Sequence, residues 1–331
     1  MTRQSGLALV LVLWVLSLLT IMAGSFALSM RRETAVTEGI NTRAKAQAVA
    51  ESGLAIAEMM LLNPDANKRW RTDGSIYEVA SDTAKIRVRL FAEIGKIDIN
   101  HANQTQLQTL IDAAPAPEEG TQKTNLVSAI LDWRDEDEEV RIEGAEKPEY
   151  QAAGLGYSPR NKAFQSIDEL QLVLGMNKDI FLWMQPLITV YSGQADVAVD
   201  TAAKEVLQLL PNIDTRLLDT YLAARMASAI NNQPPPPLPS TSAEGGDVVL
   251  ENTEDTAPDE PLAGMFTLVA ESLLDDGSSA MLSVVIEPAE GEAIPFKVLK
   301  WQQITSADTS LFADEMSELL VKQYAQSEFD N

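Results

Sequence analysis

The clearest pattern in the sequence is an uninterrupted apolar stretch near its start. Residues 7–30, LALVLVLWVLSLLTIMAGSFALSM, contain no charged side chain. As a helix rising about 1.5 Å per residue they would extend about 36 Å, enough to cross the hydrocarbon core of a membrane. Helical character continues, because residues 33–62 lack proline and are rich in Ala, Glu, Met and Leu. The pattern predicts one helix of roughly 55 residues that ends at Asn63–Pro64.

The second half of this predicted helix is amphipathic. Its apolar residues recur near helical spacing; they are Val36, Ile40, Ala44, Leu54, Ala57 and Leu61. The alternative interpretation of the apolar stretch is a secretory signal cleaved near Ala27. The stretch is longer than the apolar core of about 7–15 residues that such signals carry, which favours the long helix.

Strand-like alternation occurs on both sides of a helical block. Residues 75–80 and 84–91 predict a hairpin, in which apolar residues alternate with arginines. Three further strands are expected at 266–270, 280–286 and 296–301. The residues between the two groups are helical in pattern up to position 230. Residues 231–261 are Pro-rich and then acidic, which is typical of a linker that cannot bury a core.

A short motif occurs twice, a hundred residues apart. Residues 97–102, IDINHA, align with residues 197–202, VAVDTA, and each copy is followed by leucines at helical spacing. Asn100 and Asp200 are the residues able to cap the helix that follows. The repeat resembles helix-hairpin-helix domains, many of which grip DNA backbones. Its turns lack the glycines and basic neighbours that this grip needs, so we expect a protein-contact scaffold.

Charge and composition narrow the range of functions. The chain has 25 Lys plus Arg against 49 Asp plus Glu, a formal net charge of −24. A phosphate surface would repel most of this molecule, which argues against nucleic acid and anionic lipid as partners. The absence of cysteine removes disulfides and thiolate chemistry. His101 is the only histidine, so a His-based catalytic group is hard to assemble, and we expect no enzyme.

An acidic cluster at residues 132–139, DWRDEDEE, is the one candidate site for chemistry. Calcium prefers several carboxylate oxygens on a flexible loop. Asp135 and Asp137 alternate as loop ligands would, Asp132 lies just upstream, and Glu146 could close the site. The spacing is not that of an EF-hand. These four residues are candidate calcium ligands, and the alternative is a solvated acidic surface. The acidic residues form runs and not an isolated pair, which disfavours a carboxylate-based hydrolase.

The six residues before the apolar stretch, MTRQSG, are polar, carry one basic side chain and end in Gly6. This segment resembles a type IV prepilin leader, which a prepilin peptidase cuts after the glycine before it methylates the new N-terminus. The resemblance implies cleavage between Gly6 and Leu7 and N-methylation of Leu7. Members of that family usually carry Glu at the fifth mature position, where its carboxylate neutralises the terminal ammonium of a neighbouring subunit. Here that position is Leu11.

Over nearly its whole length the chain resembles the K-type minor pseudopilins of the bacterial type II secretion system. The resemblance rests on the Gly6–Leu7 junction, residues 132–137, the GAE segment at 144–146, the Ala102 and Ala202 motifs, and strands ending near Trp301. It implies an α+β pseudopilin fold, in which a long N-terminal helix packs on a small antiparallel sheet. It further implies a large inserted helical, helix-hairpin-helix-like domain that binds calcium at the acidic cluster.

The resemblance divides the chain into six segments. They are a prepilin leader peptide (1–6), the transmembrane part of the N-terminal helix (7–30), the helix remainder with the first strands of the pseudopilin domain (31–95), the inserted α-domain (96–230), the Pro-rich acidic linker (231–261) and the C-terminal strands that complete the pseudopilin domain (262–331). The implied location is the bacterial inner membrane, crossed once, with the bulk of the chain in the periplasm.

The implied role is assembly without catalysis. The chain is expected at the tip of the pseudopilus, where it initiates or caps assembly and supports export of folded periplasmic proteins across the outer membrane. The implied partners are the H, I and J types of minor pseudopilin in a tip complex, the major pseudopilin, the prepilin peptidase and secreted substrates, with no nucleic acid. The alternative is a stand-alone membrane-anchored periplasmic protein that binds calcium or a substrate.

Overall fold

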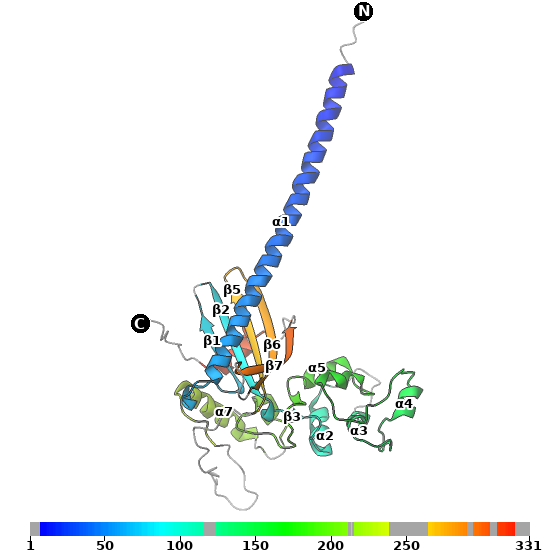
Figure 1. Ribbon diagram of the computed structural model, residues 1–331, viewed down its shortest axis with the longest axis vertical. Helices are drawn as coiled ribbons and strands as arrows, with labels where there is room; N and C mark the ends of the chain where they lie inside the picture. The colour runs from blue at the N-terminus through cyan, green and yellow to red at the C-terminus, as the bar shows by residue number, and fades with distance from the viewer. Residues whose placement is uncertain are drawn as a thin grey trace, which may run out of the picture.

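One long helix, α1 (Leu7–Leu61), extends far beyond the rest of the protein in the computed structural model (Figure 1). The structure describes residues 7–81, 83–115, 124–210, 213, 215–237, 264–289, 294–304 and 310–321. The 55 residues of α1 and its end just before Asn63–Pro64 confirm the predicted helix. Within the described residues, α1 alone is long and apolar enough to cross a membrane, and its most apolar window is entirely unburied.

Only the last turns of α1 pack on the body of the protein. The buried positions follow helical spacing and are mostly small: Ala46, Ala50, Gly53, Leu54, Ala57 and Leu61. A Cβ atom at Gly53 would lie 2.5 Å from Cγ2 of Ile86, so glycine allows the helix to approach the sheet closely. Of the apolar residues noted at helical spacing, Leu54, Ala57 and Leu61 are buried. The other three, Val36, Ile40 and Ala44, are exposed because α1 has already left the sheet at that level.

The body contains a six-stranded sheet with the strand order β7–β6–β5–β2–β1–β8. The strands are β1 (Asp73–Ala80), β2 (Ala84–Ala92), β5 (Phe266–Leu274), β6 (Ser279–Pro288), β7 (Phe296–Ile304) and β8 (Leu320–Val321). The predicted hairpin and the three later strands are therefore confirmed. All neighbours pair antiparallel except β1 and β8, whose short parallel pairing was not predicted.

The two faces of the sheet are covered differently. On one face α1 packs over β2, β5 and β6, and alternate residues such as Val88, Ala270 and Leu282 fill the core between them. On the other face a smaller cluster of Ile76, Met281 and Leu311 packs near the 3₁₀ helix η5 (Asp314–Leu319). The main core of this layer therefore depends on α1.

Between β2 and β5 the chain forms a helical insert beside the lower end of the sheet (Figure 1). Its elements are η2 (Glu93–Gly95), β3 (Ile97–Asp98), α2 (Gln104–Ala113), α3 (Thr124–Arg134), α4 (Lys147–Ala152), η3 (Ile167–Leu172), α5 (Lys178–Met184), β4 (Ile188–Thr189), α6 (Lys204–Leu207) and α7 (Thr215–Ile230). A second core, distinct from that of the sheet, includes Leu107, Ile130 and Trp133. Of the predicted linker, residues 238–261 lie outside the described residues. The structure has the predicted α+β fold with an inserted helical region.

The two copies of the sequence repeat share a contact that was not predicted. Nη2 of Arg134 donates to the carbonyl oxygen of Ala102 at 2.6 Å, and Nη1 of Arg225 donates to that of Ala202 at 2.8 Å. The predicted caps are wrong: α2 is capped by Asn103, and α6 begins after an alanine with no side-chain cap. Asn100 instead bonds the backbone of Phe164, because it faces the insert core and not the helix.

Candidate metal site and joints of the insert

A buried polar cluster joins the insert to the sheet. Nζ of Lys96 lies 2.6 Å from Oε1 of Glu93. Thr189 of β4 and Thr267 of β5 each donate to Glu93 at 2.5 Å, so one hydroxyl comes from the insert and one from the sheet. Nζ of Lys96 also donates to Thr267 at 3.2 Å. Because both carboxylate oxygens and the ammonium have partners, the pair avoids the cost of an uncompensated buried charge.

A second joint is made by α7. Nε of Arg225 lies 3.1 Å from Oδ2 of Asp73 at the start of β1, and both side chains are buried. Arg71 donates to the carbonyl oxygen of Arg225 at 2.8 Å and to Oγ of Ser228 at 2.9 Å. Burial lowers the pKa of Arg71. The neighbouring charge of Asp73 raises that pKa, but by less than burial lowers it. Together the two joints fix the near end of the insert, the end beside the sheet.

At the far end, three consecutive residues close α3 and point in different directions. Trp133 is buried and stacks on Phe164, with ring centroids 6.0 Å apart. Arg134 turns back to Ala102 in the contact described above. Asp132 is completely buried and faces the loop that follows. Successive helical residues are rotated by about 100°, which is why DWR at a helix end serves three purposes.

Asp132 organises the acidic loop. Its Oδ2 accepts a hydrogen bond from the amide of Ala145 at 2.9 Å, and its Oδ1 lies 2.8 Å from Nη1 of Arg141. The same guanidinium nitrogen also pairs with Asp135. Hydrogen bonds to Asp135 and Asp132 raise the pKa of Arg141. This one basic residue therefore brings two of the predicted calcium ligands together.

Glu146, the residue before α4, has an unusual electrostatic setting. Burial, together with the charges of Asp132, Asp135 and Asp137, raises the pKa of the Glu146 carboxyl to about 7. Oε1 of Glu146 and Oδ1 of Asp135 are buried and have no hydrogen-bond partner in the described structure. Buried carboxylate oxygens that lack partners, next to a carboxyl whose pKa is raised by its acidic neighbours, favour a bound cation.

The fourth predicted ligand, Asp137, is exposed, and its Oδ1 accepts from the amide of Glu139 at 2.8 Å. Within the described residues, no three acidic or histidine side chains lie close enough to form a metal-binding group. Arg141 sets the present spacing of Asp132 and Asp135. The donors are all carboxylate oxygens and fit calcium in type and charge. The calcium site stays a prediction.

Sequence reasoning did not predict the structural roles of two residues that shape this loop. Arg141 is the only basic residue between positions 135 and 146, and that isolation was the available signal. Gly144 lies against Asp132, and a Cβ atom there would overlap Oδ2 of the aspartate. A glycine is therefore required where the loop passes the buried carboxylate.

His101, the only histidine in the sequence, lies next to the carboxylate of Asp98. Its Nδ1 lies 3.2 Å from Oδ1 of Asp98. The buried Asp98 also accepts from Oγ of Ser192 at 3.0 Å and from the amides of Asn100 at 2.8 Å and Gly193 at 2.8 Å. Asp98 therefore ties β3 to the segment after β4, and these contacts account for its burial.

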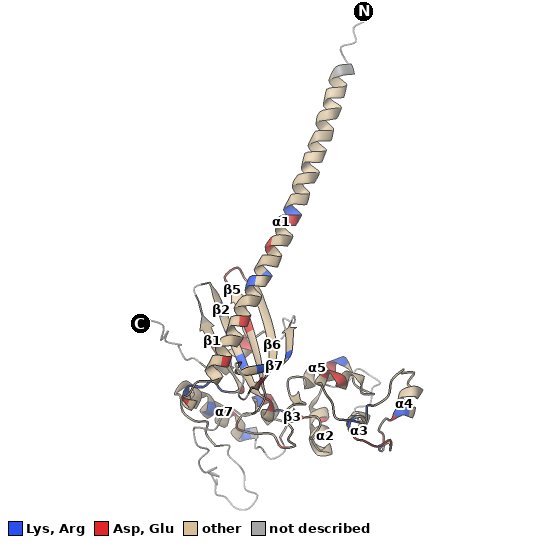
Figure 2. Ribbon diagram, viewed as in Figure 1, with Lys and Arg blue, Asp and Glu red and all other residues tan. Residues whose placement is uncertain are grey.

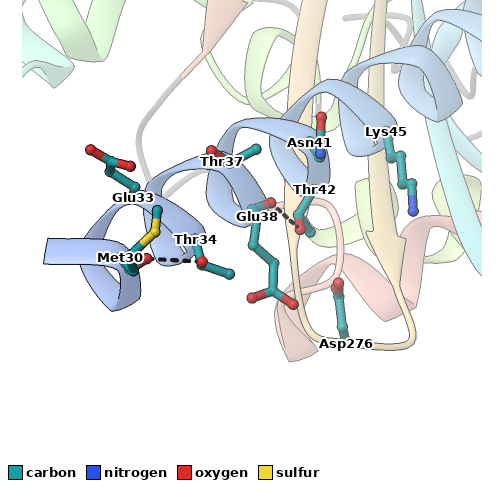
Figure 3. A pocket seen from close by; sticks show the side chains of 9 residues that line it. All are labelled: Met30, Glu33, Thr34, Thr37, Glu38, Asn41, Thr42, Lys45 and Asp276. Atoms are coloured by element: carbon teal, nitrogen blue, oxygen red, sulfur yellow. Dashed lines mark hydrogen bonds between the residues drawn. The ribbon is translucent and has the colours of Figure 1, made fainter. Parts of the chain in front are cut away.

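A polar hollow of about 650 Å³ lies between α1 and the β5–β6 turn (Figure 3). Its lining residues are Met30, Glu33, Thr34, Thr37, Glu38, Asn41, Thr42, Lys45 and Asp276. The hydroxyl of Thr34 donates to the carbonyl of Met30 at 2.9 Å, and that of Thr42 donates to the carbonyl of Glu38 at 2.8 Å. Because these two hydroxyls donate to their own helix, neither donor is left for a ligand.

The predicted processing site lies at the start of α1. Gly6 lies outside the described residues, and α1 begins at Leu7. Leu11 is 59% exposed, on the part of α1 that extends away from the sheet. Cleavage between Gly6 and Leu7 therefore stays a prediction.

A long apolar helix packed on one face of an antiparallel sheet is the architecture of a pilin-like subunit, here enlarged by a helical insert. Residues 85–193 match the family model described as type II secretion system (T2SS), protein K. The type II secretion system protein K of Klebsiella pneumoniae is 27% identical over 233 residues, which cover 63% of this chain and 69% of the relative. That of Dickeya chrysanthemi is 29% identical over 122 residues, 36% of this chain and only about a third of the relative's length (32%).

The family model and both relatives agree with one another, and the chain is similar to type II secretion system protein K over the matched residues. This confirms the predicted resemblance to that family. A chain from the GspK-GspI-GspJ complex of enterotoxigenic Escherichia coli is also similar, with 17% identity and a TM-score of 0.48 over 83% of this chain and 100% of that one. Similarity at this level is too low to establish a role.

Proposed function

We propose that this chain is the minor pseudopilin at the tip of the type II secretion pseudopilus, where it initiates or caps assembly and supports export of folded periplasmic proteins. The observation that carries the proposal is the insert. It lies beside the sheet and reaches well away from α1 (Figure 1). In a filament whose subunits stack through parallel helices, this bulk would collide with a subunit above it, and only the tip has none.

The N-terminal helix supports the same position. Residues 9–30 of α1 are exposed and apolar, as a segment would be that crosses the inner membrane once and later packs among other helices. Leu11 cannot neutralise the terminal ammonium of a neighbouring helix, whereas a glutamate there would do so. The terminal ammonium of this subunit can be neutralised by a neighbour's glutamate, but this subunit cannot do the same for a neighbour. Such a subunit suits the end of a filament.

The proposal predicts one copy per filament. Quantitative mass spectrometry of isolated pseudopili of different mean lengths measures the ratio of this chain to the major pseudopilin. The ratio should fall as the filaments lengthen, because a tip subunit does not scale with length. A constant ratio would place the chain in the shaft.

We propose the H, I and J types of minor pseudopilin as its partners in a tip complex, together with the major pseudopilin below it. The similarity to relatives named as protein K of a type II secretion system supports partners within that system. Co-purification of the full-length chain with the candidate pseudopilins in detergent tests this. A chain that is recovered alone, while the other minor pseudopilins are recovered together, would favour the stand-alone alternative.

We propose that a prepilin peptidase cuts between Gly6 and Leu7 and that Leu7 is then N-methylated. Mass spectrometry of the mature protein should show methyl-Leu7, and a Gly6→Val variant should stay membrane-inserted but unprocessed, because a side chain at that position obstructs the peptidase. A Ser5→Ala variant is the control and should be processed. A mature chain that begins after Ala27 would contradict the proposal.

We propose that Asp132, Asp135, Asp137 and Glu146 hold a structural calcium ion. The two buried oxygens without partners support this, as does the mutual repulsion that raises the pKa of Glu146. When bound, calcium would supply positive charge that cross-links the loop. An ion that binds only the folded state raises stability according to its concentration over its dissociation constant.

The calcium proposal is tested by melting the full-length protein with calcium and with chelator. Calcium should raise the melting temperature, and the double substitution Asp135→Asn/Asp137→Asn should abolish that rise. The control Glu138→Gln/Glu139→Gln removes the same charge from the same loop and should keep most of the rise. Equal melting temperatures with and without calcium would return the loop to a solvated acidic surface.

A further inference from the structure

The loop between α3 and α4 exposes two apolar side chains at the far end of the insert. Ile142 is 92% exposed and Val140 is 50% exposed. Single exposed apolar residues are common on protein surfaces and by themselves need no explanation. What distinguishes this pair is that the backbone carrying it is held in place from both sides.

Hydrogen bonds fix the segment that presents Ile142. The amide of Arg141 donates to Oδ2 of the buried Asp132 at 3.3 Å, and its guanidinium pairs with Asp132 and Asp135. Oγ of Ser128 on α3 donates to the carbonyl oxygen of Ile142 at 3.0 Å. Immediately afterwards the chain turns, with the amide of Gly144 donating to the carbonyl of Arg141 at 2.8 Å. A side chain presented on a fixed backbone loses less entropy when it binds.

The surroundings of this pair are acidic and remote from the sheet. The exposed neighbours include Glu136, Glu138, Glu139 and Glu143. The helices α3 and α4 that flank the loop lie at the end of the insert farthest from α1 and the sheet (Figures 1 and 2). A membrane with anionic headgroups would repel such a surface, whereas a protein pocket rimmed by Lys and Arg would complement it.

We propose that Val140–Ile142 is a docking tip that places Ile142 in an apolar pocket rimmed by basic residues on a protein outside the pseudopilin complex. This rests on the proposed tip function, because the other pseudopilins would then pack along α1, at the opposite end of the molecule. The carboxylates steer the partner, and Ile142 supplies the apolar contact. The backbone bonds from the amide of Arg141 to Asp132 and from Ser128 to the carbonyl of Ile142 keep that side chain presented.

The test uses the full-length protein in secreting cells that lack their own copy. Ile142→Ser should lower secretion about tenfold, because an apolar anchor contributes about that much to association. Ile142→Leu should secrete normally. Leu182→Ser, on α5 of the same insert and 50% exposed, is the matched control and should also secrete normally. All variants should accumulate to equal levels.

A photo-reactive benzoylphenylalanine side chain identifies what Ile142 meets. At position 142 it should cross-link to a protein other than the pseudopilins, and at position 182 it should not. The triple variant Glu138→Gln/Glu139→Gln/Glu143→Gln should lower the yield several-fold if charge steers the encounter. Cross-links only to pseudopilins, or only to lipid, would overturn the inference.

Failure of this inference is distinguishable from failure of the proposed function. Full secretion by Ile142→Ser, in cells whose secretion depends on the chain, would overturn the docking tip and leave the tip function intact. Normal secretion by cells that lack the chain altogether would contradict the proposed function itself.

Discussion

The two ends of the insert treat buried charge in opposite ways. At the near end, the Glu93–Lys96 pair has partners for each of its charged atoms, and the Arg225–Asp73 pair is buried with Arg71 and Ser228 around it. At the far end, a buried oxygen of Asp135 and one of Glu146 have no partner in the described structure, and an isoleucine faces solvent. At the near end the buried charged groups pair with one another. At the far end two buried carboxylate oxygens can still accept a bond.

This difference distinguishes polar groups that stabilise the fold from polar groups that are able to bind another molecule. A buried ion pair with all partners present holds one geometry and offers nothing to a ligand. A carboxyl whose pKa is raised by burial and acidic neighbours, as in Glu146, can still bind an ion or a partner. We therefore interpret the near end as the joint that orients the insert on the sheet, and the far end as the region that meets other molecules.

The largest expected effect comes from breaking the near end. Arg225→Met should lower the free energy of unfolding by about 3–5 kcal/mol, because Asp73 would remain buried without its partner. Chemical unfolding of the protein in detergent measures this. Arg160→Met removes an arginine from the more exposed pair with Glu169, 3.0 Å apart, and should cost less than about 1 kcal/mol. Equal losses in the two variants would contradict a structural joint at Arg225.

At the far end, loss of Asp132 should have an intermediate effect. Asp132→Asn places an amide where two backbone amides and Arg141 need an acceptor, and should cost about 2 kcal/mol in chelator. Asp137→Asn, at the exposed candidate position, should leave the unfolding free energy in chelator unchanged. If both substitutions were neutral, Asp132 would not organise the loop.

The pH dependence of stability should report Glu146. Its pKa is raised from the ordinary value of 4.5 to about 7 in the folded protein, so the folded state binds the proton more tightly than the unfolded state. Its contribution is therefore fully present below about pH 4.5 and is lost as the pH rises toward 7. Glu146→Gln should remove about 1 kcal/mol of this loss after allowance for solvent screening.

Unfolding of parent and Glu146→Gln from pH 4.5 to 8, in chelator, measures the difference. Parallel curves would mean that Glu146 titrates normally in the folded protein. Added calcium should flatten the parent curve if the ion binds there, because bound calcium favours the ionised carboxylate.

The smallest effect is expected for the exposed isoleucine. Ile142→Ser should change the free energy of unfolding by less than about 0.5 kcal/mol, because almost none of that side chain is buried in the protein. The same unfolding assay measures it. A loss above about 1 kcal/mol would mean that Ile142 packs within the protein and is not presented for docking.

Much of the sheet layer could be predicted because local patterns determine it. A long apolar stretch, a proline that ends it and period-two alternation located α1, the hairpin and the later strands to within a few residues. Which turn of α1 meets the sheet could not be predicted, since Val36 and Leu54 lie in the same helical pattern and only the position of the sheet distinguishes them. The two-residue β8 is likewise defined by its partner β1.

The candidate site was predictable in part for the same reason. The DWRDED segment indicates carboxylates on a loop, and the structure brings Asp132 and Asp135 together. The sequence could not show that Arg141 would pair with Asp132 and Asp135, because a single arginine among acidic residues has many nearby partners in the chain. Nor could it show that Asn103, and not Asn100, caps α2, since both precede the helix and only the tertiary contact with Phe164 decides.

The position of the insert on the filament tests the tip function most directly. Gold particles directed at the insert of the intact protein, on isolated pseudopili viewed by electron microscopy, report that position. We predict one label per filament, always at one end. Labels spaced regularly along the filament would contradict the account, because the insert would then fit between stacked subunits.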